Sequence, residues 1–285
     1  MSLLEVENLR VAFDTESGPV EAVRGISFGV DRERVAIVGE SGSGKSVTGR
    51  SILRLVRPPG RVEADTMRFD GQDLLALSER RMRAIRGQRI AMVMQDPKFA
   101  LNPVMTIGDQ MTEGLRHRER MGRRKATAKA IDMLAAVQIR DGARVMRAYP
   151  HEMSGGMGQR VMIAMMLIPD PDLLIADEPT SALDVTVQAE VLAILDDLVK
   201  ERGMGLIFIS HDLRLVSRFC DRVLVMYLGQ IVERLDARDL DAAQHPYTRG
   251  LLNCLPSIGG ERGALPVLQR EASWAECQDG EERSC

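Results

Sequence analysis

A glycine-rich octapeptide near the N-terminus carries the residue types that bind phosphate. Gly39-Glu40-Ser41-Gly42-Ser43-Gly44-Lys45-Ser46 fits the pattern G-x-x-x-x-G-K-[ST] at every fixed position. Glycines let the backbone wrap around a phosphate with its N–H groups turned inward, and the start of the following helix adds partial positive charge. In such a loop Lys45 reaches the β- and γ-phosphates of a nucleotide, and the Ser46 hydroxyl is a ligand for Mg²⁺. An apolar strand before it and an apolar helix after it favour a phosphate loop over an ordinary glycine-rich turn.

An apolar run that ends in two acidic residues supplies complementary chemistry. Residues 173–176 are Leu-Leu-Ile-Ala, and Asp177 and Glu178 follow directly. Open parallel sheets bind ligands at the C-terminal ends of their strands. We therefore expect Asp177 to hold Mg²⁺ from the second shell of ligands and Glu178 to orient the attacking water. Many strands end in an acidic residue, so this pattern alone does not indicate a nucleotide site. Together with the phosphate loop it does.

A serine and paired glycines open a later apolar helix and predict a second anion site. Ser154, Gly155 and Gly156 precede Gln159 and the apolar residues 161–167. The N-terminus of a helix attracts anions through its free backbone N–H groups. Nothing else in this chain is an obvious ligand for that site.

Three further motifs separate the chain from kinases, GTPases and helicases, which share the first two motifs. Gln95 ends an apolar strand within Val93-Met94-Gln95-Asp96-Pro97. Ser181-Ala182-Leu183-Asp184 follows the acidic strand immediately. His211 lies at the end of the apolar strand 206–209, a location that suits a sensor of the γ-phosphate better than an ordinary surface histidine.

Together these motifs resemble those of the ATP-binding cassette (ABC) family, and they occur in that family's order over residues 3–255. The resemblance implies that the signature Ser154-Gly155-Gly156, with Gln159, binds the γ-phosphate of an ATP held by the opposite subunit. It also implies a head-to-tail dimer that encloses two ATP molecules, with Ser181-Ala182-Leu183-Asp184 at the dimer contact. The signature departs slightly from the family's commonest form, with Met153 for Leu and Met157 for Gln.

The resemblance assigns the other candidates to ATP and Mg²⁺. Phe13 matches the aromatic residue that stacks on adenine, with plain packing in the sheet as the alternative. The expected catalytic residues are Lys45, Gln95, Glu178 and His211. The expected Mg²⁺ ligands are Ser46, Gln95 and, through water, Asp177. The expected contacts with ATP are Phe13, Gly39, Glu40, Ser41, Gly42, Ser43, Gly44, Lys45, Ser46 and Val47.

Three segments narrow the resemblance to the dipeptide/oligopeptide/nickel importers. They are residues 39–46, residues 93–97 with 101–103, and the most telling, His245-Pro246-Tyr247-Thr248-Arg249-Gly250-Leu251-Leu252. The resemblance implies two membrane permease subunits, a homologous ATPase subunit or a second copy of this chain, and an extracytoplasmic substrate-binding protein. The expected location is the cytoplasmic face of the inner membrane. An exporter ATPase and a soluble non-transport cassette are the alternatives, and the solute stays open among peptides, nickel, opines and sugars.

The residues that follow Gln95 are expected to meet a coupling helix of a membrane subunit. They include Phe99, Leu101 and Asn102. The alternative is that Pro97 and Pro103 only make the loop rigid.

The composition fits this interpretation. The chain has 285 residues, of which 45% are hydrophobic, 28% charged and 4% aromatic, and its formal net charge is -3. Nucleic-acid binding usually requires a strongly basic face, so this balance argues against a nucleic-acid partner. The longest apolar run covers residues 161–168, whereas a spanning helix needs about 20 residues. The first residues lack the apolar core of a signal peptide. The four cysteines are too few for a disulfide scaffold, so we expect a reducing cytosol as the compartment.

The elements that must position these motifs indicate an α/β fold. Apolar runs at 35–38, 173–176, 206–209 and 223–226, separated by helix-length segments, predict a buried and mainly parallel sheet. With the resemblance, this is the core of a P-loop NTPase (RecA-like). Four short strands at 3–6, 11–13, 20–23 and 26–30 predict an N-terminal antiparallel β subdomain. Helical spacing at 125–138 predicts an inserted helical subdomain at about 100–160.

The C-terminal residues predict a separate appendage. Residues 236–285 hold nine acidic residues and five arginines, and periodicity ends near residue 259. We expect an ATPase domain over 1–258 and an acidic extension over 259–285. Many relatives in the importer class carry a cysteine cluster there, but this chain offers only Cys254, Cys277 and Cys285. Iron–sulfur clusters usually require four thiolates, so the expected cofactors are ATP and Mg²⁺ without a cluster.

Overall fold

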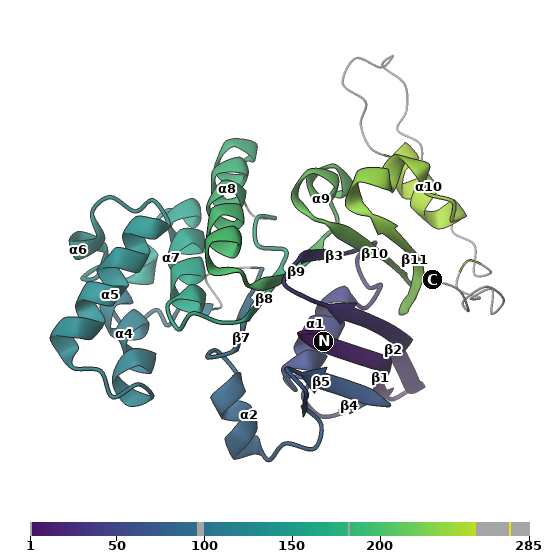
Figure 1. Ribbon diagram of the computed structural model, residues 1–285, viewed down its shortest axis with the longest axis horizontal. Coiled ribbons are helices and arrows are strands. Elements are labelled where there is room, and N and C mark those ends of the chain that lie inside the picture. The colour runs from purple at the N-terminus through teal and green to yellow at the C-terminus, as the bar shows by residue number, and fades with distance from the viewer. Residues whose placement is uncertain (1, 96–99, 182, 255–273, 275–285) are drawn as a thin grey trace. The chain divides into compact units, whose positions relative to one another are not determined.

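The computed structural model describes residues 2–95, 100–181, 183–254 and Trp274. The chain divides into two compact units (Figure 1). The first consists of Met1–Leu75 with Phe208–Cys285, and the second is Ala76–Ile207. Among the described residues, no helix is both long and apolar enough to cross a bilayer.

An antiparallel sheet begins the first unit. Its strands are β1 (Leu4–Thr15), β2 (Gly18–Val30), β4 (Gly60–Glu63), β5 (Thr66–Phe69) and β6 (Gln72–Asp73). The order is β2-β1-β5-β6, and β4 also pairs with β1. Alternate residues of β1 are buried, as expected of a sheet with one solvated face.

The prediction of four short strands at the N-terminus was wrong. The segments join into two long strands, because irregularities in the register between β1 and β2 bend the hairpin without ending either strand. Gly25 lies inside β2 with a positive φ of 72°, and a Cβ there would approach Asn8 Oδ1 to 2.8 Å. Gly25 therefore allows close strand approach and does not terminate the strand.

The first unit also contains parallel strands and their helices. β3 (Arg34–Val38) pairs in parallel with β10 (Arg222–Tyr227), and β11 (Gln230–Asp236) is antiparallel to β10. The helices are α1 (Lys45–Ile52), α9 (Leu213–Phe219), the 3-10 helix η2 (Ala237–Ala242) and α10 (Pro246–Asn253). Val35, Ala36, Ile37 and Val38 are all buried, which explains the continuous apolar run in β3.

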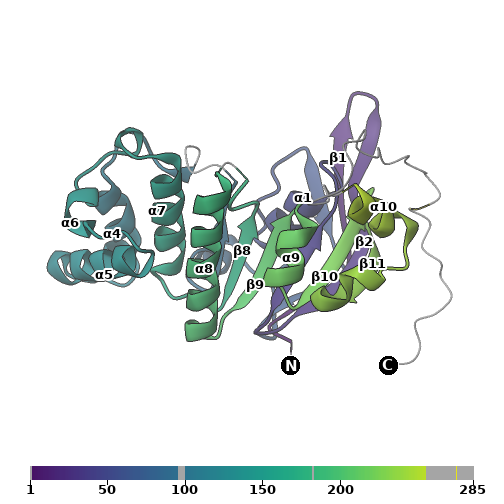
Figure 2. The same cartoon turned by 90° about the horizontal axis from the view of Figure 1, so that it is seen from above.

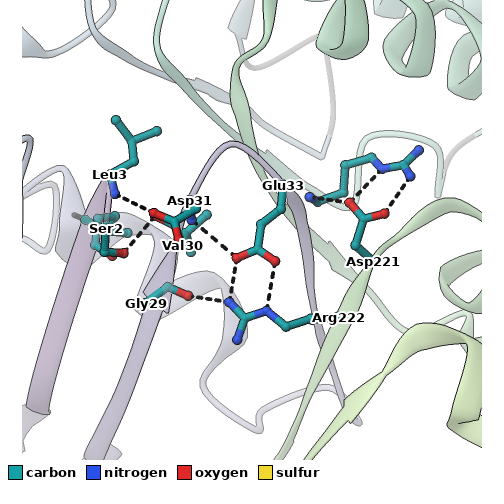
Figure 3. A network of polar contacts seen from close by, with 10 residues as sticks. Ser2, Leu3, Gly29, Val30, Asp31, Glu33, Asp221 and Arg222 are labelled. Carbon is teal, nitrogen blue, oxygen red and sulfur yellow. Dashed lines mark hydrogen bonds and ion pairs between the residues drawn. The ribbon is translucent and has the colours of Figure 1, made fainter.

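Charged side chains fix the turn that leads into β3 (Figure 3). The Arg222 guanidinium donates to both carboxylate oxygens of Glu33, at 2.7 and 2.9 Å, and to the Gly29 carbonyl at 2.7 Å. Arg34 pairs with Asp221 at 2.7 Å. A hydrogen bond from Arg34 holds the pKa of Asp221 below its usual value. These contacts tie the end of β2 and the start of β3 to the start of β10.

The second unit has two paired strands and a group of helices. β7 (Ile90–Val93) and β8 (Leu173–Asp177) pair in parallel. The helices are α2 (Glu79–Ile85), α4 (Ile107–His117), α5 (Arg123–Ala136), α6 (Gly142–Val145), the 3-10 helix η1 (Pro150–Glu152), α7 (Gly155–Leu167) and α8 (Val185–Arg202). Figure 2 shows α4, α5, α6 and α7 gathered in one cluster. β9 (Gly205–Ser210) starts in the second unit and ends in the first.

The α/β fold predicted from the sequence is confirmed. The apolar runs at 35–38, 173–176, 206–209 and 223–226 are β3, β8, β9 and β10. The helical spacing at 125–138 corresponds to α5. The strands β4, β5, β6 and β11 were not predicted, because they are short or interleaved with polar residues.

Candidate nucleotide-binding and hydrolysis site

The loop at 39–44 depends on glycine at two positions where the backbone passes close to other main-chain atoms. Gly39 has φ +151°, and a Cβ added to it would lie 2.2 Å from the Met226 carbonyl oxygen. Gly44 has φ +101°, and its Cβ would lie 2.5 Å from the Ala22 carbonyl oxygen. Any side chain at either position would clash with backbone, so these glycines are required for the shape of the loop.

The amino group of Lys45 lies inside this loop. Lys45 is 5% exposed, and its Nζ donates to the carbonyl oxygens of Gly39 and Glu40 at 2.8 and 2.7 Å. Lys45 is also the first residue of α1, and Ser46 is the second. Lys45 and Ser46 thus place an ammonium group and a hydroxyl at a helix start, and these are donor types that bind phosphate.

Two contacts from later parts of the chain hold the outer side of the loop. The Gly229 N–H donates to the Ser43 carbonyl at 3.1 Å. The Glu40 N–H donates to the Tyr247 hydroxyl at 2.9 Å. The segment around Tyr247 was predicted to indicate the importer class, with no predicted part in the nucleotide site. The partners are 207 residues apart, so local pattern offers no signal for the contact.

Phe13 and His211 also belong to the first unit. Phe13 is half-buried on β1 opposite Gly60, where a Cβ would come within 2.7 Å of the Phe13 ring. His211 is exposed in the turn between β9 and α9. The neighbouring Asp212 caps α9 by accepting the Leu215 N–H at 3.1 Å. Stacking of Phe13 on adenine and γ-phosphate contact by His211 stay predictions.

Gln95 and Glu178 come together in the second unit. Gln95 Nε2 donates to Glu178 Oε2 at 3.0 Å. The contact follows from the sheet, because Gln95 comes shortly after β7 and Glu178 directly after β8, and Val93 pairs with Ala176. Glu178 has a positive φ of 47°, unusual for a residue with a side chain and frequent where function requires a fixed direction. Asp177, the last residue of β8, is 3% exposed.

The oxygen donors proposed for Mg²⁺ are chemically suitable. A serine hydroxyl, an amide oxygen and a carboxylate are the hard ligands that this ion prefers. Ser46 offers a hydroxyl, Gln95 an amide oxygen and Asp177 a carboxylate, and their joint role as Mg²⁺ ligands stays a prediction. Within the described ranges, no cluster of three or more His, Cys, Asp or Glu side chains suits a metal ion.

The signature residues lie at the start of α7. Ser154 caps the helix, accepting the Met157 N–H at 3.4 Å. A Cβ on Gly155 would meet open space, whereas one on Gly156 would lie 2.6 Å from a Val187 methyl group. Gln159 is 1% exposed, and its Nε2 has no hydrogen-bond partner among the described residues.

A cavity of about 380 Å³ adjoins the signature within the second unit. Its lining includes Ser154, Gly156, Arg140, Arg144 and Arg160. Arg160 forms an ion pair with Glu190. Asp141 also lines this cavity and forms an ion pair with Arg144, so the lining combines three arginines, one acidic residue and a helix start.

The segment after Glu178 is held by its own hydrogen bonds. The Ser181 hydroxyl donates to the Glu178 carbonyl at 3.2 Å. Asp184 caps α8, accepting the N–H groups of Thr186 and Val187 at 3.1 and 3.0 Å. Leu183 is half-buried, and the predicted Ala182 lies outside the described residues.

Two of the four cysteines, Cys220 and Cys254, lie in the described part of the chain. Cys220 is buried, and this burial raises the pKa of its thiol well above the usual value. Cys254 is half-buried at the end of α10. Cys277 and Cys285 lie outside the described residues, as does Phe99 of the expected membrane contact.

The comparisons with known proteins agree with this geometry. The profile of the ABC transporter family matches residues 23–181. A putative peptide import ATP-binding protein of Brucella abortus is 50% identical over 269 residues, 93% of this chain and 81% of the relative. The oligopeptide transport ATP-binding protein OppD of Bacillus subtilis is 48% identical over 260 residues, 90% of this chain and 72% of the relative.

Solved cassette structures share the fold. The dimeric structure of MJ0796, a bacterial ABC transporter cassette, has a TM-score of 0.73 and 26% identity, covering 82% of this chain and 99% of that one. CbiO1 of Clostridium perfringens, part of the transporter complex CbiONQ, has a TM-score of 0.71 and 26% identity, covering 85% and 91%. A post-hydrolysis state of MJ0796 bound to ADP and Pi matches equally well.

Proposed function

We propose that the chain, which belongs to the ABC transporter family and is an ATP-hydrolysing transporter subunit, powers an importer of peptides or related small solutes. The observation that supports the proposal most is the large share of the chain that its relatives match. Relatives named as peptide import, oligopeptide transport and dipeptide transport ATP-binding proteins match 90–93% of the chain. On this proposal residues 1–258 form the ATPase domain and 259–285 an acidic extension.

The first unit binds the nucleotide phosphates. The loop 39–44 presents backbone N–H groups, and Lys45 moves its amino group from the carbonyls of Gly39 and Glu40 to phosphate oxygens. Phe13 stacks on the adenine and His211 contacts the γ-phosphate. Ser46, Gln95 and, through water, Asp177 would hold Mg²⁺, which would supply neutralisation of the phosphate charge.

The second unit activates water. Glu178 orients or deprotonates the attacking water, and its hydrogen bond with Gln95 supports this direction of the carboxylate. Little covalent chemistry is required of the protein, because positioning and electrostatic stabilisation account for most of the catalysis of phosphoryl transfer.

Hydrolysis requires a second ATPase subunit, either this chain again or a homologue. Ser154, Gly155, Gly156 and Gln159 bind the γ-phosphate of the ATP held by that partner. Residues 181–184 line the dimer contact. The cap that Ser154 forms puts the start of α7 at the signature residues, and a helix start attracts anions, which supports this assignment.

The other partners are two permease subunits and an extracytoplasmic substrate-binding protein, with this chain peripheral at the cytoplasmic face of the inner membrane. The region after Gln95, which includes Phe99, Leu101 and Asn102, contacts a coupling helix of a permease. Leu101 is buried and Asn102 exposed at this point of the second unit.

The test is transport by the reconstituted complex. The chain is placed with its permease subunits in proteoliposomes, and ATP-dependent uptake of labelled tripeptide or Ni²⁺ is measured with the binding protein present. Inward accumulation that stops when Lys45→Ala replaces the wild type supports the proposal. Outward movement alone would show an exporter and contradict it.

A further inference from the structure

The hydroxyl of Tyr247 is bound to the main chain of the phosphate loop. Tyr247 is 0% exposed at the start of α10, and its hydroxyl oxygen accepts the Glu40 N–H at 2.9 Å. α10 lies beyond residues 23–181, where the family profile matches. A side chain from the C-terminal part of the chain thus contacts the loop that binds ATP.

The Glu40 N–H belongs to the same peptide unit as the Gly39 carbonyl. That carbonyl accepts the Lys45 ammonium at 2.8 Å. A trans peptide unit is planar and its N–H and C=O point in opposite directions, so fixing one fixes the other. Tyr247 therefore sets the direction of a carbonyl that holds Lys45, without itself approaching the phosphates.

The position of Tyr247 is itself constrained from two sides. Its backbone N–H donates to His245 Nδ1 at 3.2 Å, and burial lowers the pKa of His245, which favours the neutral imidazole that can accept this bond. Its ring centroid lies 4.4 Å from that of Tyr227 and 6.2 Å from that of Trp274. Trp274 also lies 6.0 Å from Tyr227. Aromatic pairs at these separations are favourable beyond the area that they bury.

We propose that Tyr247 is a positioning residue for nucleotide binding, and that Trp274 of the C-terminal extension supports it through this aromatic cluster. The proposal rests on the function proposed above, because it concerns the same phosphate loop. With the hydroxyl in place, the loop holds Lys45 ready for the β- and γ-phosphates. Without the hydroxyl, the Glu40 N–H loses this acceptor, and Tyr247 no longer fixes the direction of the peptide unit.

The first test replaces Tyr247 with phenylalanine in the full-length chain, which removes one oxygen and keeps the ring. Loss of one hydrogen bond corresponds to a change of about fivefold in affinity. We expect the Kd for MgADP, measured by calorimetry, and the KM for MgATP each to rise by about that factor. The kcat at saturating MgATP should stay within about twofold, as for a residue that acts on ground-state binding.

Tyr227→Phe is the matched control, because it removes a hydroxyl from the adjacent ring but not the one that contacts Glu40. It should leave the Kd for MgADP within about twofold of the wild type. An unchanged Kd in Tyr247→Phe, or an equal rise in Tyr227→Phe, overturns the proposal. Binding of MgADP does not require hydrolysis, so a wild type that binds but does not hydrolyse ATP contradicts the proposed function and leaves this test intact.

Amide exchange of the wild-type protein provides a second measurement if Tyr247→Phe fails to fold. The Glu40 amide should exchange more slowly than the amides of the exposed Ser41 and Gly42. Equal exchange at all three positions would mean that the bond to Tyr247 does not persist in solution, and this result overturns the proposal.

Trp274 tests the contribution of the extension, because it is the only tryptophan of the chain. Saturating MgADP should change its fluorescence, and the midpoint should move to about fivefold higher MgADP in Tyr247→Phe. Trp274→Ala should raise the Kd for MgADP by about twofold. If MgADP does not change the Trp274 fluorescence and Trp274→Ala does not change the Kd for MgADP, the proposed role of Trp274 is wrong.

Discussion

The two units of the chain hold their candidate residues by different means. In the first, the loop 39–44 is shaped by main-chain contacts, with Gly39 and Gly44 packed against carbonyl oxygens and Lys45 held by carbonyls. In the second, side chains carry the arrangement, through the Gln95–Glu178 hydrogen bond and the helix caps of Ser154 and Asp184.

This difference predicts which substitutions should affect nucleotide binding and which should affect turnover. A cradle made of backbone tolerates no added atom, so substitutions there should abolish binding. A side-chain arrangement loses one interaction at a time, so substitutions in the second unit should slow turnover while binding persists. Nucleotide affinity and the rate of ATP hydrolysis can both be measured on one preparation of each variant.

The largest effect on nucleotide affinity is expected for Gly39→Ala. Its Cβ would lie 2.2 Å from the Met226 carbonyl oxygen, so the loop must move away from its phosphate-binding shape. We expect the Kd for MgADP, measured by calorimetry, to rise by about 100-fold. Gly18→Ala is the control, since Gly18 also has a positive φ but no atom lies within 4 Å of an added Cβ. Equal loss of affinity in both variants would show that backbone strain alone, and not the close approach, is responsible.

A smaller and different effect is expected for Gln95→Ala. It removes the hydrogen bond to Glu178 at 3.0 Å and one expected Mg²⁺ ligand. We expect kcat for ATP hydrolysis to fall by about tenfold while the Kd for MgADP changes less than about threefold. Gln88→Ala, in the same unit, should leave both unchanged. A fall in affinity with unchanged kcat would reverse the division of labour between the units.

The smallest effect concerns stability and pH. Asp221→Asn should lower the free energy of unfolding at pH 7 by about 0.5 kcal/mol, because the ion pair with Arg34 is partly exposed to solvent. The pKa of Asp221 is lowered in the folded state, so its contribution is present above the ordinary aspartate range and is lost as pH falls through the folded value. Urea titrations of both proteins should therefore converge in acid. A difference that persists at low pH would rule out the ion pair as its cause.

The sequence predicted those parts of the molecule that local patterns determine. The phosphate loop has a fixed spacing, and β3 and β8 are continuous apolar runs, so their positions could be found without long-range contacts. The contact between Gln95 and Glu178 could also be predicted from the sequence, since both residues follow predicted parallel strands.

Other features depend on partners far along the chain. The irregular register of β1 and β2 turned four expected strands into two, because pairing between strands bridges positions that look like breaks. The left-handed backbone of Glu178 has no residue-type signal, since glycine is the usual residue for such φ values. The contact between Tyr247 and Glu40 arises only when α10 packs behind the phosphate loop.

The most direct test of the account is Glu178→Gln, which removes the carboxylate from the second unit and leaves the phosphate loop of the first unchanged. ATP binding and hydrolysis are measured on the same sample, by calorimetry and by release of inorganic phosphate. We expect the Kd for MgATP to stay within about threefold and kcat to fall by about 100-fold or more. Near-normal hydrolysis by this variant would contradict the role of Glu178 and the separation of binding from water activation.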